Sequence, residues 1–267
     1  MPKDLNELYE WKSKSLITLN VSKNQVVSYT RNISFDSQYN IENESLEKVD
    51  EIKDLGVTFD KSFKFKEHIL ERIDKAYSVI GIIKRNFMHL SEISLCMFYK
   101  AMVRSQLEHA VSVWCPYRKE DILSIEKVQM RATKLVSSVE NLLYIEILEK
   151  LKLPTLKFGR IRGDMTEVYK IINPKYDACT TVTLDFSKDS ETRGNKHKLN
   201  QNHCKYNLRK HCFTNRIVAI WNSLSGYSVD INSINIFKNR LDNHWCMQDI
   251  MYDFESELTA IENRGFE

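Results

Sequence analysis

The sequence predicts a mainly helical α+β protein, in which a small antiparallel β part precedes a series of amphipathic helices. Three observations support this fold class. The 267 residues contain only seven glycines and four prolines, which favours helix. Apolar residues recur at helical spacing through most of the chain after residue 64. Before that point, short segments alternate apolar and polar residues, as strands do.

The composition is that of a soluble globular protein, with 42% hydrophobic and 28% charged residues. The net charge is only +3, so any surface that binds nucleic acid must be local. Six cysteines without a short regular spacing are typical of free thiols, which indicates an intracellular location, either nucleus or cytoplasm. We expect neither secretion nor membrane insertion, because the sequence has no apolar signal core and no run of about 18 apolar residues.

Residues 1–64 contain the predicted β part. A short amphipathic helix is predicted over residues 4–18. Strand-like segments follow at 26–29, 33–41 and 49–59. Within the last segment, the local pattern predicts that Gly56 forms a bulge in one strand. The local pattern around Lys23 likewise predicts a lysine that lies in a turn and is exposed to solvent.

Residues 65–174 are predicted to form a helical bundle with short connections. A long apolar stripe runs through residues 65–87. Ser91 is a good N-cap for a second helix, which should continue until Pro116 stops it. Further helices are predicted over 120–136, over 142–151, and from the break at Pro154 to Pro174.

Residues 175–195 are rich in Thr, Ser, Asp and Lys and are predicted to be a linker. Residues 196–267 follow as a basic, helical C-terminal region. No Asp or Glu occurs between residues 193 and 216, where Tyr206 and Phe213 are available to stack on bases. This stretch is the strongest compositional signal for nucleic-acid binding.

Several phrases of the sequence resemble one family. Tyr-Lys-Ala-Met-Val-Arg at 99–104, Leu-Glu at 107–108 and Trp-Cys-Pro at 114–116 resemble a segment downstream of the catalytic centre in LINE-type, jockey-like non-LTR retrotransposon reverse transcriptases. Further phrases follow the family in the same order, at 125–134, 160–165, 192–194, 215–218, 221–224 and 237–241. The resemblance covers residues from about 5 to 245.

The chain also departs from the family pattern. Ser105 stands where the family usually has proline, which should leave the helix straight because proline kinks helices. His109 replaces a tyrosine, and Met130 replaces an arginine whose charge is therefore lost.

The resemblance implies a fragment of an RNA-directed DNA polymerase from a transposable element. Residues 1–64 would be a palm remnant, 65–174 a thumb-like bundle and 196–267 the C-terminal region. Lys23 would be the lysine near the departing pyrophosphate. Leu55, Gly56 and Val57 would form the primer grip.

No catalytic residue is assigned to this chain. The family binds two metal ions with an Ala-Asp-Asp motif and an earlier carboxylate, and this chain has no Asp-Asp. We therefore expect that it begins beyond the catalytic turn and does not polymerise DNA alone. No cofactor is expected in it, and Mg²⁺ would belong to the full-length enzyme only. His203-Cys204 and His211-Cys212 do not have a usual zinc spacing, so no metal site is predicted.

The expected partner is an RNA/DNA primer–template held through its phosphates, without sequence readout. The candidate contacts are Arg85, Arg104, Arg131, Lys134, Arg160, Arg162, Arg193, Lys196, Lys198, Arg209, Lys210 and Arg216. Two alternatives stay open. The chain could be a non-enzymatic helical module, derived from a transposon, that binds other proteins or nucleic acid, or it could be transposon debris that folds poorly.

Overall fold

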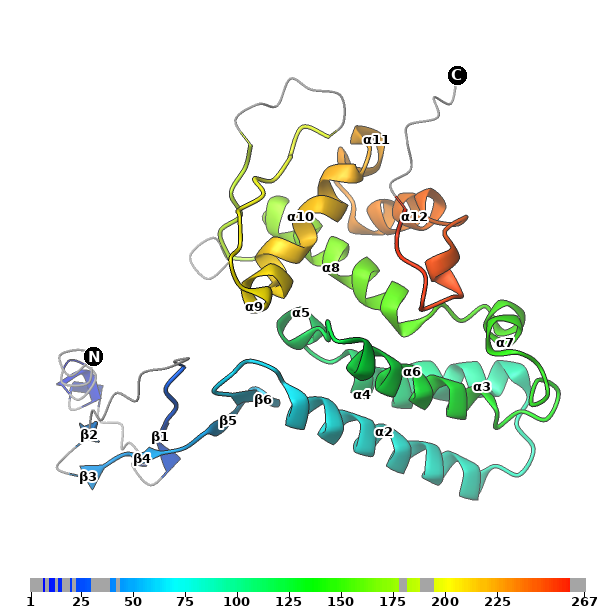
Figure 1. Cartoon of the computed structure of the whole chain (residues 1–267), viewed down its shortest axis with the longest axis horizontal. Coiled ribbons are helices and arrows are strands. Elements are labelled where there is room, and N and C mark those ends of the chain that lie inside the picture. The colour runs from blue at the N-terminus through cyan, green and yellow to red at the C-terminus, as the bar shows by residue number, and fades with distance from the viewer. Residues whose placement is uncertain are drawn as a thin grey trace. The chain divides into compact units, whose positions relative to one another are not determined.

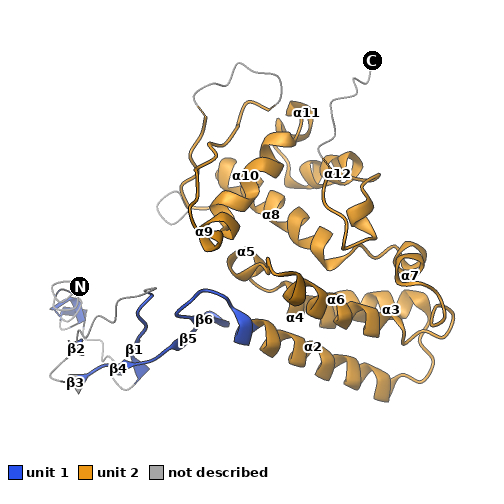
Figure 2. Cartoon of the chain, in the orientation of Figure 1, with its two compact units in different colours: residues 1–68 blue, residues 69–267 orange. Residues whose placement is uncertain are grey.

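The computed structural model describes residues 7, 10–12, 14–15, 20, 23–29, 39–41, 44–177, 182–187 and 195–259. This part of the chain is mostly helical, with short strands near the N-terminus (Figure 1). The predicted α+β class is confirmed at this level. The chain divides into two compact units, residues 1–68 and 69–267 (Figure 2). Within the described part, no helix is both long enough and apolar enough to cross a lipid bilayer.

The described residues of the first unit form three separate two-stranded sheets. β1 (Gln25–Val26) pairs in parallel with β4 (Glu47–Lys48). β2 (Asn40–Ile41) and β3 (Glu44–Ser45) are antiparallel, as are β5 (Glu51–Asp54) and β6 (Val57–Asp60). The expectation of one small antiparallel sheet was therefore too simple, because one of the pairs is parallel. The predicted helix at 4–18 and the predicted strand at 33–41 lie largely outside the described residues.

The segment 49–59 is a hairpin rather than one bulged strand. Leu55 and Gly56 connect β5 to β6, with φ angles of 45° and 81°. Positive φ at both central residues is the requirement of a type I′ turn, whose twist matches that of the two strands. The register pairs Asp54 with Val57 directly across this turn. The prediction of a bulge at Gly56 was wrong, because the glycine reverses the chain.

Leu55 is a poor residue for this turn, since a left-handed backbone disfavours a side chain with a Cβ, and its side chain is 89% exposed. We expect Leu55→Asn to stabilise the hairpin by about 0.5–1 kcal/mol, because asparagine tolerates this conformation. Amide hydrogen exchange of residues 51–60 should slow in this variant and accelerate in Gly56→Ala. Equal exchange rates in both variants would contradict the turn assignment.

The second unit is helical. Ser91 caps α3 as predicted, because its side chain accepts a hydrogen bond from the Ser94 N–H at 3.1 Å. The long helices are α2 (Lys66–Asn86, beginning in the first unit), α6 (Lys119–Thr133), α8 (Leu156–Ile172), α10 (Phe213–Ser223) and α12 (Ile234–His244). The shorter ones are α3 (Glu92–Phe98), α4 (Arg104–Glu108), α5 (Val111–Trp114), α7 (Tyr144–Leu151), α9 (Asn207–His211), α11 (Gly226–Val229) and a 3₁₀ turn (Asp249–Met251).

The helix expected from Ser91 to Pro116 is not continuous. It passes through a π-helical turn at Tyr99–Val103 and ends at His109, and Ala110 adopts a left-handed conformation with φ 52°. The indole N–H of Trp114 donates a hydrogen bond to the His109 carbonyl at 2.7 Å. This bond satisfies one of the backbone carbonyls at the end of α4, where the helix is interrupted. The expectation of a straight helix was wrong, since the left-handed residue interrupts the helix without any proline.

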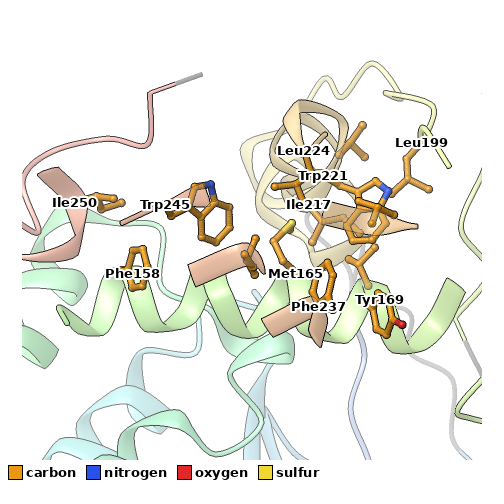
Figure 3. Packing of buried hydrophobic residues seen from close by; sticks show 14 residues of the cluster. Phe158, Met165, Tyr169, Leu199, Ile217, Trp221, Leu224, Phe237, Trp245 and Ile250 are labelled. Atoms are coloured by element: carbon orange, nitrogen blue, oxygen red, sulfur yellow. The ribbon is translucent and has the colours of Figure 1, made fainter. Parts of the chain in front are cut away.

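One hydrophobic cluster joins α8 to the helices that follow residue 195 (Figure 3). The ring of Tyr169 stacks on Phe237 at 4.4 Å, and Phe158 meets Trp245 edge to face at 5.9 Å. Trp221 is fully buried, and its indole N–H donates to the His197 carbonyl at 2.8 Å. Aromatic side chains of this size contribute much of the core energy. Helix α8 and the C-terminal helices therefore belong to one compact unit, although the sequence analysis placed a linker between them.

Candidate nucleic-acid interface

Four of the twelve predicted phosphate-binding cations are used within the fold. Arg216 makes two hydrogen bonds to Asp164, from Nε at 2.8 Å and from Nη2 at 2.9 Å, and Nη2 also donates to the Ser112 carbonyl at 2.9 Å. Burial raises the pKa of Asp164 and outweighs the opposing effect of these hydrogen bonds. The pair connects α8 to α10 and to α5, so Arg216 is not free to hold a phosphate.

Arg162 and Arg104 are also paired. Arg162 contacts both carboxylate oxygens of Asp242, at 2.5 and 2.7 Å, which joins α8 to α12. Arg104 donates to Glu108 at 2.7 Å, one turn further along α4. This pair lies on Gly159 of α8, where an added Cβ would come within 2.6 Å of Arg104 Nη2. Arg162 therefore joins two helices, whereas Arg104 is paired within α4 at the point where that helix lies against α8.

Arg160 lies in a buried polar cluster. Its side chain is 4% exposed, and its Nη2 has no hydrogen-bond partner among the described residues. Glu126 of α6 is fully buried nearby and accepts the Leu156 N–H at 2.8 Å, which caps the first turn of α8. Burial raises the pKa of Glu126 to about 7, against the opposing charge of Arg160. Arg160 is therefore part of the protein interior and is not exposed for contact with a phosphate.

Arg85, Arg131 and Lys134 are exposed on the surface. The guanidinium of Arg131 lies 5.2 Å from the centre of the Tyr77 ring, which orients it by a cation–π contact. Lys134 follows directly at the end of α6. Arg85 donates from Nε to the Gly81 carbonyl at 3.3 Å within α2.

The acid-free stretch carries several exposed cations in the described part of the second unit. Lys196, Lys205, Arg209 and Lys210 are exposed and Lys198 is half-buried, whereas Arg193 lies outside the described residues. Tyr206, just before α9, is 60% exposed and so available for stacking.

The sequence analysis missed two cations that extend this surface. His211 at the end of α9 stacks on Tyr117 at 4.5 Å, with an angle of 8° between the rings. Arg118 and Lys119, which follow Tyr117, are exposed close to this contact, and Glu120 and Asp121 come next in the first turn of α6. We call Arg118, Lys119, Lys205, Arg209 and Lys210 the α9 basic surface. Nothing local in the sequence marks the contact, because about ninety residues separate its halves.

His211 contributes a neutral ring to this contact at pH 7. Burial lowers its pKa, and the neighbouring charges of Lys210 and Arg216 act in the same direction. Stacking on Tyr117 therefore positions α9 without adding charge to the surface.

The residues assigned by resemblance to the palm lie in the first unit. Lys23 is exposed, and its backbone N–H donates to the Asn20 carbonyl at 3.2 Å. Leu55 and Gly56 form the hairpin turn, and Val57 is buried beside it. Within the described ranges, no group of three His, Cys, Asp or Glu side chains is placed to hold a metal ion.

Comparisons of the chain with protein-family models, with curated proteins and with solved structures each found no match.

Proposed function

We propose that this chain binds nucleic acid through phosphate contacts, as the C-terminal, non-catalytic part of a LINE-type, jockey-like reverse transcriptase. One observation carries the proposal. In the stretch without acidic residues, Lys196, Lys205, Arg209 and Lys210 are exposed, and the contact of His211 with Tyr117 brings α9 close to Arg118 and Lys119. Cations that cluster without carboxylates between them attract a polyanion, and binding to phosphates needs no sequence readout.

The partner is a primer–template duplex or a single strand of RNA or DNA. Tyr206 is placed to stack on a base next to the cations of α9. The order of the motifs supports the reverse-transcriptase lineage, in which the second unit would act as thumb and C-terminal region. No chemical step is assigned to this chain, because its sequence lacks the Asp pair that would bind the two metal ions.

The test measures fluorescence anisotropy of labelled duplex and single-stranded oligonucleotides at several salt concentrations. We expect affinity to fall steeply with salt and to depend little on sequence. The triple variant Lys205→Glu, Arg209→Glu, Lys210→Glu should bind about tenfold more weakly or worse, with a shallower salt slope. The pair Arg131→Glu, Lys134→Glu should also weaken binding, because both side chains are exposed.

The matched control reverses three exposed lysines of α2 and α6, namely Lys66, Lys84 and Lys127. It changes the net charge by the same amount as the triple variant. If the control and the triple variant lose the same affinity, the loss is explained by the change in net charge. That result would contradict binding at the α9 basic surface. Unchanged affinity in both the triple and the Arg131/Lys134 variants would favour the alternative, a helical module that binds other proteins.

A further inference from the structure

A shallow groove of about 300 Å³ lies between α3 and α7. Its apolar lining comes from Ile93 and Met97 of α3 and from Leu151 at the end of α7. Ile93 and Met97 are 75% and 67% exposed, and they lie four residues apart, so they share one face of the helix. The groove therefore has an apolar floor that is open to solvent.

Helix α3 does not need these two side chains for its own packing. Its inner face is already formed by Leu95, and Tyr99 follows in the next turn, both buried at 1% exposure. When a short helix carries apolar residues on both its inner and its outer face, the inner face alone is enough for packing in the core. The outer apolar face is then left exposed to solvent. An exposed apolar surface beside polar residues is typical of a contact with another molecule.

Three lysines surround this floor: Lys100, Lys150 and Lys152. Lys150 forms an ion pair with Glu92 at 3.1 Å. Glu92 is the one acidic residue that lines the groove, so its charge and that of Lys150 cancel. No ion pair of Lys100 or Lys152 occurs in the part of the chain that the structure describes. The rim therefore keeps two positive charges over an apolar floor.

We propose that this groove binds an acidic amphipathic helix of another protein. The apolar side chains of that helix would cover Ile93, Met97 and Leu151, and its carboxylates would meet Lys100 and Lys152. Docking of an amphipathic helix between two helices is a common mode of peptide recognition. The surface is separate from the α9 basic surface, and the inference does not depend on the proposed function.

The lining favours a peptide over a nucleic acid. None of the residues that line the groove is aromatic, so the floor offers no ring on which a base could stack.

The probe is a fluorescein-labelled helical peptide of about 18 residues, with leucines on one face and glutamates on the flanking positions. Anisotropy should show saturable binding to the wild-type chain. The variant Lys100→Glu, Lys152→Glu should bind about tenfold more weakly or worse, because two attractive pairs become repulsive. The control Lys84→Glu, Lys127→Glu carries the same change in net charge and should bind as the wild type does.

A charge-swapped peptide, with lysines in place of the glutamates, provides the rescue. It should bind the Lys100→Glu, Lys152→Glu variant and not the wild-type chain, and this result also shows that the variant is folded. In a separate readout, the acidic peptide should slow alkylation of Cys96, which lines the groove, and leave the exposed Cys246 unaffected.

Three results would overturn the proposal. The first is the absence of saturable binding of the acidic peptide. The second is an equal loss of affinity in the groove and control variants. The third is a labelled oligonucleotide that loses affinity in the groove variant while the peptide does not.

Discussion

Asp164→Ala should lower the free energy of unfolding by about 3 kcal/mol or more, because it leaves the guanidinium of Arg216 buried without its carboxylate. The side chains of Asp164 and Arg216 are only 8% and 14% exposed, so solvent screens this pair little. Hydrogen bonds from Arg216 to the carbonyls of Ser112 and His211 would survive and limit the loss. Chemical denaturation at pH 7 measures the change.

The control for this loss is Glu167→Ala, also on α8. Glu167 pairs with Lys170 at the surface, where both side chains are about a third exposed, and its removal should cost no more than about 1 kcal/mol. The double variant Asp164→Ala, Arg216→Met should regain much of the stability, since apolar residues replace a buried ion pair well. Equal losses for Asp164→Ala and Glu167→Ala would contradict a structural role for the pair.

Glu126→Gln should make the protein more stable at pH 8, with a much smaller effect at pH 5. Burial is the largest effect on Glu126 and raises its pKa from the ordinary 4.5 to about 7. The folded state therefore holds the proton more tightly than the unfolded state, and stability falls as pH rises from 4.5 to about 7. At 1.36 kcal/mol per pH unit, this loss is about 3 kcal/mol.

Glutamine cannot ionise, and its amide oxygen can still accept the Leu156 N–H. The unfolding free energy of the Glu126→Gln variant should therefore exceed that of the wild type by up to about 3 kcal/mol at pH 8. Glu140→Gln, at an exposed position, serves as the control. A difference between wild type and Glu126→Gln that is the same at pH 5 and pH 8 would exclude titration of Glu126 in this range.

Local patterns predicted much of the helical part, because each helix shows its spacing in a continuous stretch of sequence. Ser91 predicted the start of α3, and Pro154 and Pro174 bracket α8. The break at Ala110 was not predicted, since alanine is an excellent helix former and its left-handed φ is imposed by the surrounding packing. The turn at Leu55 and Gly56 was missed because the usual Asn-Gly signal is absent.

The candidate interface was harder to predict than the fold, because counting cations does not show which of them are paired. Arg162 meets Asp242 from a position 80 residues away, and Arg216 meets Asp164 across 52 residues. In α8, the apolar stripe through Phe158, Met165 and Tyr169 leaves Arg160 on the opposite face of the helix. That face is covered by α6, a contact that the pattern of α8 alone does not indicate.

The glycine at position 159 limits how α4 and α8 can vary together. Arg104 and Glu108 occupy the space in which any side chain at 159 would begin. An alanine there would make the ends of these two flexible side chains move, unless a shorter side chain stood at 104 or 108. In chains related to this one, a larger residue at 159 should therefore accompany a displaced or smaller side chain at one of those two positions.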